Sequence, residues 1–206
     1  MQVALPPGGR ERPELDNAPA HGRDWRVTFQ EEVFAAFPWL RVLRQEILLP
    51  DGRKISDFHS VWIPDCSIVY AVTNAARVVV ERQYRHGPQC VSLMLPAGAI
   101  EADENPLAAA KRELLEETGY AAARWDSLGA FSVNGNYGCG RAHLFVAGDA
   151  KRVQDPCSED LEETEILEMG HDELTEAVYS GEIKVLAVAA LICMVNLRRR
   201  REASEG

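Results

Sequence analysis

Three glutamates, Glu113, Glu116 and Glu117, stand close together near the middle of the chain. On a helix, residues three and four positions apart are neighbours, so these side chains would share one face. Like charges at that spacing destabilise an isolated helix by about 0.2–0.5 kcal/mol per pair, and the last two also face the negative helix end. Converging carboxylates suit a hard divalent cation such as Mg²⁺. A solvated acidic face is the other interpretation of the same pattern.

The glutamates lie on the most sharply delimited helix that the sequence predicts. Asn105 is a suitable N-cap, Pro106 suits the first helical position, and Gly119 suits a left-handed stop. The glutamates are expected opposite the buried side of this helix. The residues expected to form the buried side are Leu107, Ala110, Leu114 and Thr118.

The residues around this helix resemble the Nudix box, G-x5-E-x7-R-E-U-x-E-E-x-G-U, in which U is a bulky apolar residue. With each fixed type at about 7% abundance, the seven fixed positions recur by chance on the order of 10⁻⁸ per starting point. The resemblance therefore favours a metal site over a solvated face. The specified positions are filled by Gly98, Glu104, Arg112, Glu113, Leu114, Glu116, Glu117, Gly119 and Tyr120.

The resemblance implies an α/β fold, an α/β/α sandwich around a mixed β-sheet, with a loop-helix-loop pyrophosphatase site. It implies that Glu113 and Glu117 are the principal metal ligands and that Glu116 assists them in binding and catalysis. The backbone carbonyl of Ala97 would complete the site. The implied cofactor is Mg²⁺, with Mn²⁺ as a substitute, because both prefer oxygen ligands.

The other residues of the motif look structural in the family. Glu104 and Arg112 are expected to pair and to hold the loop against the helix, with Gly98 and Gly119 shaping the backbone. A bound cation would neutralise and orient a diphosphate and acidify a bound water, so an acidic protein could bind an anion that it otherwise repels.

Segments outside the box resemble the branch that acts on ADP-ribose and nucleoside diphosphate sugars. They are residues 82–87, 95–98, 141–147 and 181–183. The implied reaction is Mg²⁺-dependent hydrolysis of such a diphosphate, giving NMP and a sugar phosphate. Arg85 resembles the arginine that contacts the diphosphate, and a guanidinium fork suits phosphate geometry. An ordinary exposed arginine is the alternative.

In this branch the catalytic glutamate tends to come from a loop well after the box. The corresponding segment here is the acidic run 158–165, in which Asp160, Glu162 and Glu163 are the candidates. Glu162 is our choice as general base or additional metal ligand. A solvated acidic loop would have the same composition.

One position departs from the branch. Many ADP-ribose hydrolases carry a proline sixteen residues beyond the box, where this chain has Asn136. The glycine-rich segment 134–140 could let the backbone approach a terminal sugar, or it could be a simple turn. The departure leaves two rivals open, a nucleoside triphosphate pyrophosphatase and a Nudix-like sensor that binds nucleotides without cleaving them.

Composition limits the partners and the compartment. The 206 residues carry a formal charge of -10, which argues against a surface that binds nucleic acid through phosphates alone. The longest apolar run is too short for a membrane span. Five widely spaced cysteines without a CxxC pair favour a reducing cytoplasm. The family resemblance implies a homodimer whose N-terminal strands cross between subunits.

The chain is expected to divide into a mobile N-terminal tail at 1–22, a single Nudix domain at 23–201 and a short tail at 202–206. An Asp51-Gly52 turn predicts a β-hairpin within 47–63. Further segments are expected to form regular structure. The expected strands are 67–73, 77–84, 91–95, 125–133 and 141–147, and the expected closing helices are 171–180 and 183 to about 201.

Overall fold

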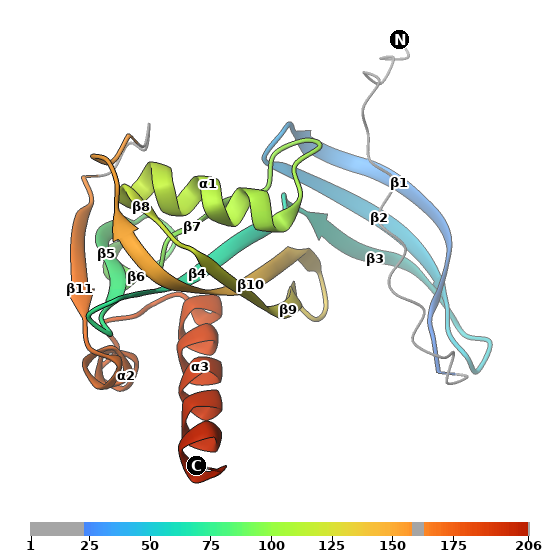
Figure 1. The fold of residues 1–206 in the computed structure, drawn as a ribbon. Helices are drawn as coiled ribbons and strands as arrows, with labels where there is room; N and C mark the ends of the chain where they lie inside the picture. Colours follow the sequence, from blue (N-terminus) through green and yellow to red (C-terminus); the bar gives the residue numbers. More distant parts are fainter. Residues whose placement is uncertain (1–22, 158–162, 206) are drawn as a thin grey trace.

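The computed structural model describes residues 23–157 and 163–205, so the predicted tail at 1–22 lies outside the described residues. A mixed β-sheet forms the middle layer, with main strand order β1-β2-β3-β10-β4-β5-β11. Helix α1 (Pro106–Thr118) covers one face, and α2 (His171–Tyr179) and α3 (Leu186–Glu205) lie on the other, as Figure 1 shows. The predicted α/β/α sandwich is confirmed.

The sheet centre consists of β4 (Cys66–Thr73) and β10 (Gly138–Arg152), which pair in parallel over most of β4. Strand β5 (Val78–Arg85) and β11 (Glu165–Met169) continue the sheet in antiparallel register. Long apolar runs in the central strands are buried on both faces, as expected for strands with helices above and below. The remaining strands of the body are β6 (Cys90–Met94), β7 (Ala97–Ala99), β8 (Tyr120–Ala121) and β9 (Arg124–Asn134).

The two faces of the sheet have separate cores. Beneath α1, Val69, Val79 and Phe145 pack with Ala110 and Leu114. The other face has a larger cluster, in which strand residues meet α2 and α3. Successive side chains of a strand therefore pack into different cores, so that one strand contacts the helices on both faces of the sheet.

Helix α1 has the predicted ends. Asn105 Oδ1 accepts a hydrogen bond from the Ala108 N–H at 2.9 Å, and Gly119 has a φ of 75°, the left-handed conformation that glycine tolerates without strain. Ala110, Leu114 and Thr118 of the predicted stripe are fully buried, and Leu107, at the first turn, is partly buried. Local signals were sufficient here because both caps are single residues with strong preferences.

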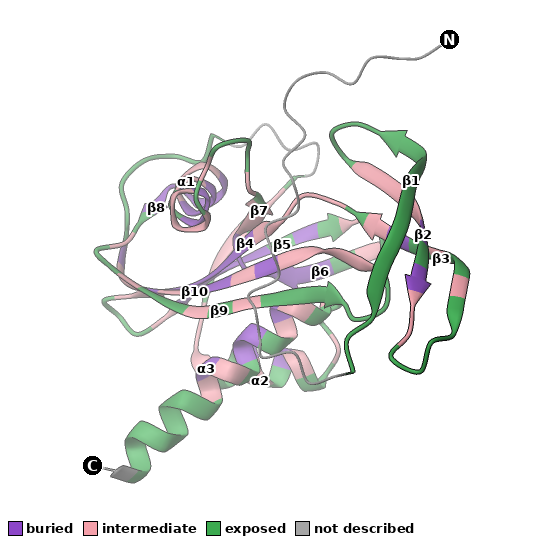
Figure 2. Cartoon of the chain, turned by 90° about the vertical axis from the view of Figure 1, so that its right-hand side faces the viewer, coloured by how far each residue is buried: buried purple, intermediate pink, exposed green. Residues whose placement is uncertain are grey.

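A three-stranded arm extends from this body (Figure 1). It comprises β1 (Arg26–Ala36), β2 (Leu40–Leu48) and β3 (Lys54–Trp62), each antiparallel to the next. The predicted hairpin is confirmed, with Gly52 at a φ of 86° between β2 and β3. Strand β1 was not predicted, and all of its residues are exposed (Figure 2).

Other boundaries also differ from the prediction. Helix α3 begins at Leu186 instead of 183 and continues to Glu205, so most of the expected tail at 202–206 is helical. Its last turns project from the body (Figures 1 and 2) and are held by an i,i+4 pair between Arg198 Nε and Glu202 Oε1 at 3.1 Å. Strand β11 was not predicted. Within the described residues, no helix combines the length and the hydropathy of a membrane span.

Candidate functional site

Glu113 and Glu117 are buried, so the prediction that all three glutamates lie opposite the buried side of α1 is wrong for these two. Each residue is only 9% exposed. The chain entering α1 covers them, and the Ala97 N–H donates a hydrogen bond to Glu117 Oε2 at 2.8 Å. A solvated acidic face is therefore the wrong interpretation for these two glutamates. Glu116 is more open, with 43% of its side chain exposed.

Gly98 brings the backbone against the carboxylate of Glu113. A Cβ atom at this position would lie 2.1 Å from Glu113 Oε1, far closer than van der Waals contact allows. Strand β7 holds the glycine there through pairing with β4, in which Gly98 lies opposite Ser67. Glycine is thus required by close approach at this position, and its backbone conformation is not left-handed.

Arg112 connects the loop to the helix with all five of its N–H donors. Nε and Nη2 bind the two oxygens of Glu104, both at 3.0 Å, and Nη2 also binds the Ala99 carbonyl at 3.0 Å. Nη1 binds Glu113 Oε1 at 2.7 Å and Glu116 Oε2 at 3.1 Å. The hydrogen bond from Arg112 lowers the pKa of Glu104, and the bond to Glu104 raises the pKa of Arg112.

The donor set suits a divalent cation. Carboxylate and peptide oxygens are hard ligands, and two of the carboxylates are buried beside the backbone of Ala97 and Gly98. In residues 23–157 and 163–205, no three acidic, histidine or cysteine side chains are grouped so that they could hold a metal ion. Instead, the guanidinium of Arg112 lies against Glu113 and Glu116 and supplies a positive charge there.

The proposed base loop is only partly described. Glu162 and Asp160 lie outside the described residues, and Glu163 is exposed. Just before the run, the chain is bonded to α1, because the Cys157 N–H donates to the Glu116 carbonyl at 2.8 Å. On the other side, Glu165 pairs with Arg82 of β5. Both ends of the run are therefore attached to elements that carry site residues.

Arg85 occupies the last position of β5, opposite Cys90 of β6, and is partly buried. Its Nη1 atom lies 3.4 Å from Gln83 Oε1. Sequence reasoning singled out Arg85 but missed the buried polar residues Glu81 and Gln83 that precede it on the same strand. The sequence has no signal for their burial, because Glu81-Arg-Gln-Tyr-Arg85 lacks an apolar alternation; the alternation of buried and exposed residues is seen only in the structure.

The glycine-rich segment 134–140 contains the turn between β9 and β10. Asn134 Oδ1 accepts hydrogen bonds from the N–H groups of Asn136 and Tyr137, at 2.9 and 2.8 Å. The Tyr137 carbonyl accepts from the Val61 N–H and so connects the turn to the arm. Asn136 therefore supports a hairpin where the branch often has proline.

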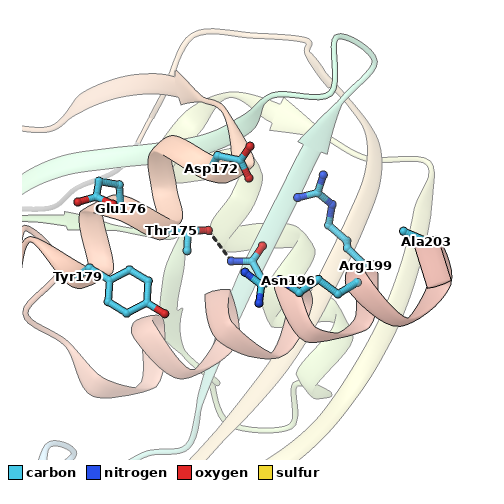
Figure 3. Close-up of a pocket in the computed structure, with 8 residues that line it drawn as sticks. Asp172, Thr175, Glu176, Tyr179, Asn196, Arg199 and Ala203 are labelled. Atoms are coloured by element: carbon cyan, nitrogen blue, oxygen red, sulfur yellow. Dashed lines mark hydrogen bonds between the residues drawn. The ribbon is translucent and has the colours of Figure 1, made fainter.

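A hollow of about 320 Å³ lies between α2 and α3, on the opposite side of the sheet from α1. Figure 3 shows Asp172 and Tyr179 of α2 on one side of it and Asn196 and Arg199 of α3 on the other, and Asn196 is hydrogen-bonded to Thr175 across the gap at 2.6 Å. The hollow is remote from the glutamates of α1, so we do not assign the site to it.

Comparison with known proteins agrees with this geometry. A family model described as the NUDIX domain matches residues 62–187. The ADP-ribose pyrophosphatase of Bacillus subtilis (strain 168) is 28% identical over 162 residues, which cover 78% of this chain and 87% of that protein. The methanol dehydrogenase activator of Bacillus methanolicus is 30% identical over 139 residues, covering 67% of this chain and 75% of the relative.

Two further proteins extend the comparison. A CMP-5'-(N-acetyl-N-hydroxy-3-aminopropyl)phosphonate hydrolase of Streptomyces rubellomurinus (strain ATCC 31215) is 26% identical over 165 residues, covering 80% of this chain and 79% of the relative. The crystal structure of an ADP compounds hydrolase shares the fold, with a TM-score of 0.74 and 16% identity over 87% of this chain and 96% of that one. With the family model matching more than half of its length, this chain belongs to the Nudix family and is a Nudix hydrolase.

Proposed function

We propose that this protein hydrolyses the diphosphate bond of a nucleoside diphosphate linked to another group, with ADP-ribose or a related sugar as the substrate and Mg²⁺ as the cofactor. The products would be NMP and a sugar phosphate. The observation that carries the proposal is the burial of Glu113 and Glu117 against the Ala97–Gly98 backbone within a complete Nudix box. Burying two carboxylates carries a desolvation cost, and a bound cation would add to the compensation that Arg112 and the Ala97 N–H supply.

The residues of the site have distinct roles in this proposal. Glu113, Glu117 and the carbonyl of Ala97 would hold the metal, with Glu116 assisting from its more exposed position. When bound, the cation supplies charge neutralisation of the diphosphate and a more acidic water. Arg112 and Glu104 keep the loop in place against α1.

Glu162 is proposed as the general base. Its support is the attachment of the flanking chain, at the Glu116 carbonyl before it and at Arg82 after it. Asp160 and Glu163 are the alternatives in the same run.

Arg85 is proposed to contact the diphosphate. It lies at the end of β5, and the preceding residues of that strand alternate between the face below α1 and the opposite face. Its guanidinium would add a positive charge to a site that is otherwise rich in carboxylates. The names of the relatives support this substrate class, because they include an ADP-ribose pyrophosphatase and a hydrolase of a CMP derivative.

The exposed arm supports a homodimer. It carries many large apolar side chains that are exposed, and so many of them on one element are unusual for a monomer. A second copy is the proposed cover, in keeping with the N-terminal strands that the family resemblance predicts to cross between subunits. The exposed apolar residues of the arm are Trp25, Val27, Phe29, Val33, Phe34, Phe37, Trp39 and Trp62.

The cytoplasm is the proposed compartment. All five cysteines are within the described residues and are free thiols. Free thiols persist where the surroundings are reducing.

Product analysis tests the proposed function. The protein would be incubated with Mg²⁺ and ADP-ribose, GDP-mannose, UDP-glucose, NADH or dNTPs in parallel, and the products separated. We expect NMP and a sugar phosphate from one diphosphate sugar. Glu117→Gln should lower kcat about a thousandfold, because several kcal/mol of metal-dependent stabilisation are lost. The control Glu176→Gln, on α2, should keep full activity.

The same assay separates the rivals. Faster release of pyrophosphate from dNTPs would favour a triphosphate pyrophosphatase. Binding of ADP-ribose without any product would favour a sensor and would overturn the proposal. A Glu117→Gln variant as active as the unchanged protein would show that the carboxylate cluster takes no part in the mechanism.

A further inference from the structure

A row of three polar side chains runs along β5 toward the end of the strand. Glu81, Gln83 and Arg85 are alternate residues, so their side chains point to the same face of the sheet. That face is the one beneath α1, because Ile166, the partner of Glu81 on β11, packs against the α1 core. Val79, two residues earlier, belongs to the same core.

Hydrogen bonds connect the row. Gln83 Nε2 donates to Glu81 Oε2 at 3.0 Å, and Arg85 Nη1 donates to Gln83 Oε1 at 3.4 Å. Glu81 is 1% exposed and Gln83 is 4% exposed, whereas Arg85 reaches the surface in part. With its Nε2 atom donating to Glu81, the Gln83 amide has its NH₂ group inward. The amide oxygen is then directed to Arg85.

Packing alone does not explain an acid at this position. Val78, Val79 and Val80 directly precede Glu81 and are completely buried. Another valine would continue this apolar run, and burying a carboxylate in its place carries a desolvation penalty. Such groups are retained where they orient a functional neighbour.

We propose that Glu81 and Gln83 are positioning residues that fix the guanidinium of Arg85 where it contacts the diphosphate of the substrate. The inference rests on the proposed function, since it assigns Arg85 to the diphosphate. The carboxylate acts through the amide, and the amide holds one N–H of the fork while the others remain available to phosphate oxygens. Loss of Glu81 would leave Arg85 present but misdirected.

A double-mutant cycle tests this relation. The affinity for α,β-methylene ADP-ribose, whose P–C–P link resists hydrolysis, would be measured calorimetrically with Mg²⁺ for four variants besides the unchanged protein. These are Glu81→Val, Glu81→Gln, Arg85→Ala and the double variant Glu81→Val/Arg85→Ala. Arg124→Ala, which removes an exposed arginine paired with Asp149 on β9 and β10, is the matched control.

We expect Glu81→Val to weaken binding about tenfold, in line with a hydrogen bond to a charged group. Arg85→Ala should weaken it at least as much, and the double variant should bind no more weakly than Arg85→Ala alone. Glu81→Gln should restore most of the affinity, because its amide oxygen still accepts from Gln83. Glu81→Val removes the desolvation cost of a buried carboxylate but leaves the buried Gln83 N–H without its acceptor, so the Tm of each variant is measured and affinities are compared at a temperature where all variants are folded.

Three results would overturn the inference. They are an unchanged affinity in Glu81→Val, losses that multiply in the double variant, and an Arg85→Ala variant that binds normally. Each leaves the proposed function intact if the unchanged protein still cleaves a diphosphate sugar. Failure of the unchanged protein to cleave or bind any such compound would overturn the proposed function together with the inference.

Discussion

The loop-helix unit around α1 and the arm of β1–β3 both contain arginine–glutamate pairs, but the pair around α1 is largely buried and the pair in the arm is exposed. Around α1, charged side chains are buried and Arg112 uses every donor it has within a single chain. In the arm, aromatic side chains such as Phe37 and Trp39 are exposed, and ion pairs lie at the surface. The first region is complete by itself, whereas the second has an apolar surface that a partner would complete. Under the functions proposed above, the α1 residues serve chemistry and the arm residues serve assembly.

Among the changes that test this comparison, Gly98→Ala has the largest expected effect, because it pushes the carboxylate of Glu113 out of place. The new methyl group would overlap that carboxylate, with only 2.1 Å between the Cβ and Oε1 atoms. A displaced ligand should lower kcat about a hundredfold and weaken binding of Mn²⁺. Steady-state kinetics and a Mn²⁺ titration followed by electron paramagnetic resonance would measure both.

Gly87→Ala is the matched control, because nothing lies within 4 Å of a Cβ at that position. It should retain activity and metal affinity. Full activity in Gly98→Ala would mean that Glu113 does not need its observed position. The buried carboxylates around α1 would then not be explained by catalysis.

Arg112→Lys should have the next largest effect, on stability. A lysine cannot reproduce the fork that binds both oxygens of Glu104 and the Ala99 carbonyl. The side chain of Arg112 is 25% exposed, so solvent screens these bonds only in part. We expect the free energy of unfolding to fall by about 2–3 kcal/mol, measured by urea denaturation. A change within error would show that the network is dispensable for the fold.

The same contrast decides what could be predicted from the sequence. The ends of α1 and the pairing of Glu104 with Arg112 follow from local signals and from the motif, so they could be derived. Burial of Glu113 and Glu117 could not, because it depends on β7 crossing that face of the helix. Strand β1 was missed because its apolar residues face no core of their own chain, and β11 was missed because the five-residue segment gains its partner from distant β5.

Phe34→Arg tests whether a second copy covers the arm. Phe34 is exposed on β1, and a charge there should oppose burial between subunits. We expect light scattering to give about twice the chain mass of 22.8 kDa for the unchanged protein and the single mass for the variant. Tyr179→Arg, which changes a more exposed aromatic on α2, should stay dimeric. A monomeric unchanged protein would assign the apolar surface to another partner.

The smallest expected effect is that of Arg44→Gln, which removes an arginine–carboxylate pair of the same chemistry as Arg112 with Glu104. Arg44 Nε lies 2.8 Å from Glu31 Oε1, as close as the bonds around α1, but both side chains are more than a third exposed. Water and salt screen such a pair, and ordering two long side chains offsets what remains of their attraction. Urea denaturation should therefore give the same midpoint for Arg44→Gln as for the unchanged protein, at low and at high salt. The midpoint could instead fall as far as in Arg112→Lys. The distance between the charged atoms, and not their burial, would then set the strength of these pairs, and the ion pair in the arm would stabilise the fold as much as the one at the site.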